Sequence, residues 1–147
     1  MIALACDHGG FDLMQEVKSY LTKRGLTYKD FGTHCSDSCD YPSIAIPAAR
    51  AIASGECERG IFICGTGIGI SIAANKISGI RAAVCSDCFS AEMTRLHNDA
   101  NVIAIGARVT GAGLALKIIE QFLDTKFEGG ERHMRRIEML KELEGGC

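Results

Sequence analysis

The stretch FICGTGIGIS, residues 62–71, joins an apolar run to a string of alternating glycines. The residues before the cysteine are bulky and typical of a strand, whereas the glycines after it leave the backbone accessible. A glycine-rich turn between a strand and a helix commonly holds an anion, because its N–H groups converge without side chains in the way. Cys64 at the mouth of this turn therefore indicates either chemistry beside a bound anion or an ordinary core thiol.

The rest of the chain repeats this alternation of short apolar runs and amphipathic segments. Strands are expected at residues 2–6, 26–31, 60–64, 80–85 and 101–105, and helices at about 11–24, 43–54, 68–76, 88–97, 111–123 and 130–143. The segment 26–31 is less apolar than the other strands, which favours a place near an edge. The pattern predicts an α/β, three-layer, Rossmann-like domain over residues 1–147. Its doubly wound five-stranded parallel sheet would have the order 2-1-3-4-5, with an extra C-terminal helix.

This strand order brings two unusual turns to one place. The chain reverses direction between the first and third strands, and ligands of such sheets bind outside the carboxyl ends of the strands at that point. The turns CDHGG (residues 6–10) and CGTGIG (residues 64–69) follow those two strands. We therefore expect both turns to face the same cleft and to serve a function there.

Composition excludes several classes of protein. The 147 residues are 47% hydrophobic and carry a formal net charge of −2, which is ordinary for one globular domain. No basic field is present to bind nucleic acid, and no apolar run reaches the roughly 18–20 residues that cross a bilayer. The stretch MIALACDHGG lacks the basic region of a signal peptide, so a cytoplasmic protein is expected.

Eight cysteines are many for this length. Only Cys85 and Cys88 have CxxC spacing, and no second pair completes a zinc pattern. A metal site and a disulfide framework are therefore both disfavoured. Most of the cysteines are expected to be structural or incidental, since a thiol at a strand end often acts as a small hydrophobic group.

The glycine string does not match the familiar nucleotide fingerprints. Gly65, Gly67 and Gly69 are spaced GxGxG rather than GxGxxG, and no GK[ST] follows them, so no nucleotide or flavin cofactor is expected. What remains is an oxyanion-binding turn with a thiol and the hydroxyl of Thr66 beside a helix that begins around Ile68. Such a site can remove a carbon-bound proton and hold the resulting enediolate oxygen. Glycines that merely allow tight packing around a buried thiol explain the local pattern equally well.

Five blocks of sequence together carry a resemblance that extends over nearly the whole chain. They are CDHGGFDL, DYP at 40–42, CGTGIGISIAANK at 64–76, RLHNDANVIAIGAR at 95–108 and GGERHMRR at 129–136. In this order they closely resemble the type B ribose-5-phosphate isomerase family, which also contains the lactose-pathway galactose-6-phosphate isomerase subunits.

The resemblance implies an aldose–ketose isomerase that works through a cis-enediolate without a metal or cofactor. It assigns Cys64 as the base that moves a proton between C1 and C2, and His97 as the group that opens the furanose ring. In another branch of the family a glutamate of the loop is the base, but this chain has Ile70 there, which leaves Cys64. The enediolate would be stabilised by Thr66 and by the loop N–H groups, which belong to Gly65, Gly67, Ile68 and Gly69.

The resemblance also implies a set of substrate-binding residues. Asp7, His8 and Asn98 would position the sugar, and the phosphate would be bound by Arg132 and Arg136, with Arg108 and His8. The two helical arginines are four residues apart and share one helix face, so they can address one phosphate. Taken singly, each residue has a plainer explanation: a helix cap for Asp7, a helix C-terminal histidine for His97, and a solvated basic face for the arginines.

One difficulty concerns distance. The helix after the fourth strand carries the chain back toward the amino end of the sheet, so His97 should end far from Cys64. We therefore expect His97 and Asn98 to reach the crevice of a second subunit. The resemblance likewise implies a homodimer with shared active sites, or a tetramer built from two such dimers.

The expected reaction interconverts ribose 5-phosphate and ribulose 5-phosphate. Six-carbon substrates such as allose 6-phosphate or galactose 6-phosphate remain open, because one methylene changes affinity by only about 1–3 kcal/mol. A non-catalytic sugar-phosphate or nucleotide sensor is the alternative from a different class.

Overall fold

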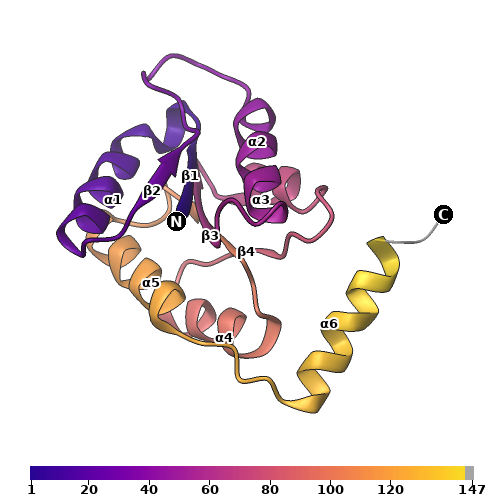
Figure 1. Ribbon diagram of the computed structural model, residues 1–147. Coiled ribbons are helices and arrows are strands. Elements are labelled where there is room, and N and C mark those ends of the chain that lie inside the picture. Colours follow the sequence, from indigo (N-terminus) through magenta and orange to yellow (C-terminus); the bar gives the residue numbers. More distant parts are fainter. Residues whose placement is uncertain (145–147) are drawn as a thin grey trace.

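The structure is a computed structural model that describes residues 1–144, in which strands alternate with helices as predicted (Figure 1). Cys147 lies outside the described residues. The strands are β1 (Ile2–Cys6), β2 (Tyr28–Asp30), β3 (Arg59–Cys64), β4 (Ala82–Val84) and β5 (Val102–Gly106). The helices are α1 (Phe11–Lys23), α2 (Tyr41–Ala53), α3 (Ile68–Ala74), α4 (Cys88–Asn98), α5 (Ala112–Asp124) and α6 (Glu131–Glu144), with a 3-10 turn η1 (His8–Gly10) before α1.

The five strands of the described chain form one parallel sheet, which confirms the α/β, doubly wound class. Their order is β2-β1-β3-β5-β4, so the last two strands are exchanged relative to the expected order 2-1-3-4-5. All five residues of β5 are buried, whereas the three of β4 are partly buried or exposed. β5 has five residues, two of them isoleucines, whereas β4 has three and two are alanines, so more apolar surface leaves water when β5 takes the inner place.

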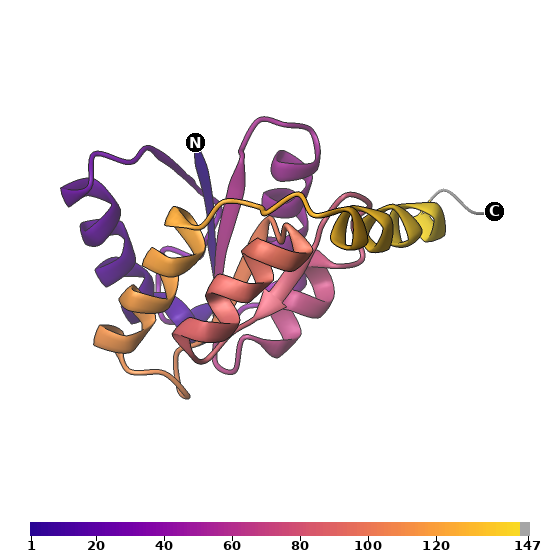
Figure 2. The ribbon, with the colours of Figure 1, turned by 90° about the horizontal axis from the view of Figure 1, so that it is seen from below.

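Two layers of helices cover the two faces of the sheet (Figure 2). Leu4 and Ile63 belong to the core formed with α1, α4 and α5. Ala5 and Phe62, the adjacent residues on the same strands, belong to the core formed with α2 and α3. Each large side chain that is fully buried in this way contributes about 1.5–3 kcal/mol. The strands are thus held from both sides, and their carboxyl ends form a rigid edge.

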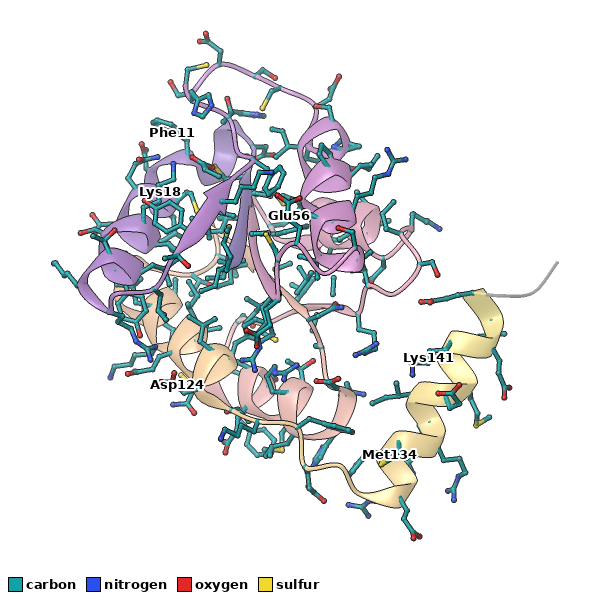
Figure 3. All side chains as sticks on the ribbon, viewed as in Figure 1. Phe11, Lys18, Glu56, Asp124, Met134 and Lys141 are labelled. Carbon is teal, nitrogen blue, oxygen red and sulfur yellow. The ribbon has the colours of Figure 1, made fainter. Side chains whose placement is uncertain are left out.

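The predicted C-terminal helix, α6, is present and stands apart from the three-layer body (Figure 1). Figure 3 shows its side chains, Met134 and Lys141 among them, spread around a largely free helix. Only His133 and Ile137 are buried on α6, while Met134 is 54% and Leu143 78% exposed. The helix therefore keeps apolar surface that one chain leaves uncovered. No helix within residues 1–144 is both long enough and apolar enough to span a membrane.

Candidate active site

A cavity of about 270 Å³ opens at the carboxyl edge of the sheet. The central strands β1, β3 and β5 end there side by side, since Cys6 pairs with Ile63 and Cys64 pairs with Gly106. The two turns that were expected to share a cleft do share it. The cavity is lined by Asp7, His8, Gly9, Tyr41, Cys64, Gly65, Thr66, Gly69 and Arg108.

Glycine is required in the turn because other segments approach it closely. Gly67 precedes α3 with a φ of +77°, in the left-handed region that favours glycine. A Cβ on Gly67 would lie 2.9 Å from the carbonyl carbon of Ile105. A Cβ on Gly69 would lie 2.8 Å from Cζ of Tyr41. The turn is therefore clamped between β5 on one side and the tyrosine ring on the other.

Cys64 is the thiol that lies at this cavity. Its Sγ accepts a hydrogen bond of 3.1 Å from the N–H of Gly67, just before the first turn of α3. A backbone N–H and the positive end of a helix both stabilise negative charge on sulfur. Two thiols elsewhere in the chain are buried, and burial raises the pKa of Cys6 to about 12 and that of Cys85 to about 11. These two are buried core thiols, whereas Cys64 lines the cavity.

The donors around Cys64 are fewer than the glycine pattern suggested. The N–H of Gly67 is bonded to Cys64, and that of Ile68 donates to Oγ1 of Thr66 over 3.3 Å. Among the hydrogen bonds of residues 1–144, none uses the N–H of Gly65 or Thr66. The exposed Thr66 hydroxyl, having accepted one bond, can still donate its proton. The N–H of Gly69, in the first turn of α3, is also unused among those bonds, so the donors available to an anion are the N–H groups of Gly65, Thr66 and Gly69 and the Thr66 hydroxyl.

Asp7 and His8 enter the cavity from the turn after β1. The buried Asp7 carboxylate accepts the N–H of Gly10 over 3.1 Å, so it caps the 3-10 turn as well as lining the cavity. Nδ1 of His8 accepts the N–H of Cys39 over 3.3 Å. A neutral His8 therefore carries its proton on Nε2, where it can donate to a ligand.

Arg108 reaches the cavity because β5 lies beside β3. Its backbone N–H donates to the carbonyl of Gly65 over 3.0 Å, and its guanidinium passes 3.5 Å from the position of a Cβ on Gly65. No carboxylate of residues 1–144 forms an ion pair with it. An unpaired guanidinium at the mouth of a cavity is suited to an anionic ligand.

Tyr41 was not singled out in the sequence, although it lies within the DYP block. It is the first residue of α2, and its ring packs on Gly69 with 37% of the residue exposed. Its only sequence signal is membership of a recognisable block, because nothing local indicates that it meets the glycine turn.

His97 and Asn98 lie near the amino ends of the strands, at the opposite end of the sheet from the cavity. α4 runs back toward the amino ends of the strands, and the carbonyl of Asn98 accepts Nε of Arg81 over 3.0 Å just before β4 begins. The five residues of β5 alone span about 16 Å at roughly 3.3 Å per residue. A single chain therefore does not bring His97 and Asn98 to Cys64, as the topology predicted.

His97 instead lies in a cluster of side chains with residues of α6. Its ring stacks on that of His133, with centroids 4.5 Å apart and planes inclined by 10°. Nε of Arg132 donates to Nε2 of His133 over 3.3 Å, and Arg136 is exposed one turn further on. Burial, followed by the charges of His97 and Arg132, lowers the pKa of His133. His133 was not predicted, since its only signal is its place between the two arginines of GGERHMRR.

A thiol, an anion-accepting turn and an unpaired arginine at the carboxyl edge of a doubly wound sheet define an enzyme of small anionic substrates. The profile of the Ribose/Galactose Isomerase family matches residues 2–140. The chain is 50% identical to "Ribose-5-phosphate isomerase B" of Escherichia coli, over 97% of this chain and 95% of that protein. It therefore belongs to the ribose/galactose isomerase family, and the resemblance of its sequence blocks is confirmed.

Two further relatives extend the comparison. The structure of ribose-5-phosphate isomerase B from Clostridium thermocellum superposes with a TM-score of 0.96 and 52% identity, over 98% of this chain and 97% of that one. The "D-erythrulose-4-phosphate isomerase" of Pectobacterium atrosepticum is 47% identical over 88% of this chain and 86% of its own. Isomerases named for different sugar phosphates thus share this fold and much of this sequence.

Proposed function

We propose that this chain is a cytoplasmic aldose–ketose isomerase that interconverts D-ribose 5-phosphate and D-ribulose 5-phosphate. The observation that carries the proposal is the Cys64 thiol, which lines the cavity while accepting the Gly67 N–H over 3.1 Å. The relatives from E. coli and C. thermocellum, which match nearly the whole chain, are both named for this activity.

Cys64 acts as the base in the proton transfer. As a thiolate it removes the proton from C2 of the open-chain aldose, and the electron pair of that bond forms the C1=C2 double bond of the enediolate. The negative charge that develops on O1 is held by the hydroxyl of Thr66 and by the N–H groups of Gly65 and Thr66. Return of the proton from Sγ to C1, with transfer of the O2 proton to O1, produces the ketose.

Ring opening and phosphate binding use a second subunit. The partner subunit's His97 takes the proton from the anomeric hydroxyl on C1. As the bond between C1 and the ring oxygen breaks, it returns a proton to the ring oxygen, a double role that suits an imidazole near neutral pH. The partner subunit's Arg132 and Arg136 bind the phosphate together with Arg108 of the first chain. Asp7, His8 and the partner subunit's Asn98 position the sugar between these two groups.

Two features of the described chain support this homodimer. The half-site with Cys64 and the half-site with His97 lie at opposite edges of one sheet. The helix α6, which carries the two arginines, exposes Met134, Met139, Leu140 and Leu143. A second copy that covers this apolar surface would complete both sites by one symmetric contact. Two such dimers can pair into a tetramer.

The first test measures ribulose 5-phosphate formation by the wild type, Cys64→Ala and Cys35→Ala with a chelator present. General-base catalysis contributes about 10²–10⁴-fold, so Cys64→Ala should lose activity by that factor. Cys35 is exposed and does not line the cavity, so Cys35→Ala is the matched control and should keep full activity. A fully active Cys64→Ala enzyme would show that another group is the base.

The sharing of sites is tested with mixed subunits. Cys64→Ala and His97→Ala chains are each expected to be inactive as homodimers. A heterodimer of the two has one site with both residues intact, so it should recover up to about half of the wild-type activity. Heterodimers isolated with two different affinity tags that regain nothing would contradict the shared site.

A second candidate is an isomerase of a four-carbon sugar phosphate, which the Pectobacterium relative favours. The six-carbon phosphates of allose and galactose belong in the same assay. The substrate with the highest kcat/KM identifies the preference. Tight binding of all of these phosphates without turnover of any would instead indicate a sugar-phosphate sensor.

A further inference from the structure

Three side chains that can bind a metal ion meet beside α6. They are His97 of α4, His133 of α6, and Glu128 of the segment that joins α5 to α6. One ligand atom from each lies within 4.8 Å of the others. Among residues 1–144 this is the one such group of three or more residues, and the pair Cys85 and Cys88 does not belong to it.

The backbone holds Glu128 close to the two rings. Its N–H donates to the carbonyl of Leu96 over 3.2 Å, which ties the connecting segment to the last turn of α4. Gly129 then adopts a φ of +72°, so the chain turns sharply into α6. A Cβ on Gly130 would lie 3.2 Å from Oε1 of Glu128 and 3.5 Å from Cδ2 of His133. The backbone turn at Gly129 and Gly130 therefore places the Glu128 carboxylate next to the buried His133 imidazole.

The chemistry of the three groups is that of a metal site. Two imidazoles and one carboxylate are the donor set of open zinc sites, with a fourth position left for water. Imidazole nitrogen also suits nickel and copper.

We propose that His97, Glu128 and His133 bind one divalent transition-metal ion, such as Zn²⁺ or Ni²⁺. The bound ion inhibits the enzyme because a coordinated His97 cannot transfer protons to the sugar. The inhibitory part rests on the proposed role of His97 in ring opening, whereas the binding site itself does not. The ion is an inhibitor and takes no part in the isomerisation.

Two adjustments accompany binding. Donors around a tetrahedral ion with bonds of about 2.1 Å lie about 3.4 Å apart, so the present group must contract. His97 is half-buried and Glu128 is exposed, which leaves both free to move toward the buried His133. If His133 coordinates the ion through Nε2, Arg132 must give up the hydrogen bond that it now donates to that atom.

The test of the site is calorimetric titration of Ni²⁺ into the reduced homodimer without a histidine tag. Nickel is the probe because zinc would also bind the free thiols. We expect one ion per chain for the wild type. Glu128→Gln should bind Ni²⁺ at least about tenfold more weakly, since loss of even a residue that only hydrogen-bonds to a metal ligand commonly lowers metal affinity about tenfold or more. Glu131→Gln removes the same charge from an exposed neighbour and is the matched control. Equal affinities for these two variants would overturn the proposed site.

The test of inhibition adds Ni²⁺ to the isomerase assay. At a concentration that saturates the wild type, turnover should fall and should return with EDTA, while Glu128→Gln should need a proportionately higher concentration. Binding without any loss of turnover would overturn the inhibitory role. If the wild type without metal has no isomerase activity, the proposed function fails, and the titration still decides the metal site.

Discussion

Replacing Gly67 with alanine tests whether the glycine turn is held rigidly against β5. The residue has a φ of +77°, and its added Cβ would lie 2.9 Å from the carbonyl carbon of Ile105 and 3.0 Å from the nitrogen of Gly106. Both atoms belong to the backbone of a strand that is buried along its whole length. A side-chain rotation cannot relieve this contact, so the turn or the strand must shift.

The expected cost has two parts. A left-handed backbone costs alanine about 1–2 kcal/mol, and overpacking in a tight core costs roughly another 1–3 kcal/mol. We therefore expect Gly67→Ala to lower the free energy of unfolding by about 2–5 kcal/mol. Gly25→Ala is the control, because Gly25 has a φ of +67° but no atom within 4 Å of its Cβ position. That variant should lose only the backbone part, about 1–2 kcal/mol.

Urea unfolding of the wild type and both variants at one protein concentration gives the loss of unfolding free energy for each variant. The difference between the two losses is the cost of the contact with β5. The same proteins should be assayed for isomerase activity, because any shift of the turn also moves the Gly67 N–H away from Sγ of Cys64. We expect Gly67→Ala to lose kcat and Gly25→Ala to retain it. Equal losses of stability in the two variants would refute the close packing of the turn. Full activity in Gly67→Ala would refute the dependence of Cys64 on that N–H.

Three further predictions concern titration and binding. Cys6 and Cys85 should resist alkylation in the folded protein at about pH 8, because burial raises the pKa of these thiols to about 12 and about 11, whereas the exposed Cys35 should react; peptide mass mapping decides. Burial and nearby charge lower the pKa of His133 in the folded protein. As the pH drops below about 6.5, the imidazole of the unfolded chain is protonated before that of the folded chain, so the free energy of unfolding should fall. His133→Phe should weaken that dependence of the urea midpoint, and an unchanged slope would contradict the assignment. Arg108→Ala should raise KM for the sugar phosphate about tenfold or more with a smaller effect on kcat, since a charged hydrogen bond contributes roughly 1.5–3 kcal/mol.

The elements themselves were largely predictable from residue pattern. The expected strand 2–6 is β1 without change, and the expected helix 11–24 is one residue longer than α1. Burial on both faces makes a central strand uniformly apolar, and burial on one side makes a helix periodic, so both patterns are local. The order of β4 and β5 was not predictable in this way. Both segments are short and apolar, and only the whole packed sheet decides which one lies beside β3.

The candidate site shows the same division. Asp7, Cys64 and Thr66 lie at or just after the ends of strands that were expected to be neighbours, so their meeting could be foreseen from topology. Tyr41 could not, because its contact with Gly69 depends on where α2 enters its layer. Nor could His133, whose stacking on His97 depends on the turn at Gly129 and on the direction of α6.

By itself, the sequence determined the alternation of strands and helices, the glycine turn after Cys64 and the family, because each is recorded in adjacent residues or in blocks of fixed order. Only the tertiary structure decided which side chains share a space. The place of β5 beside β3 brings Arg108 to the thiol. The return of α4 to the amino edge separates His97 from it by about the length of a strand. These distances depend on how layers pack, and packing is a sum over contacts between residues remote in the chain, which no local pattern records.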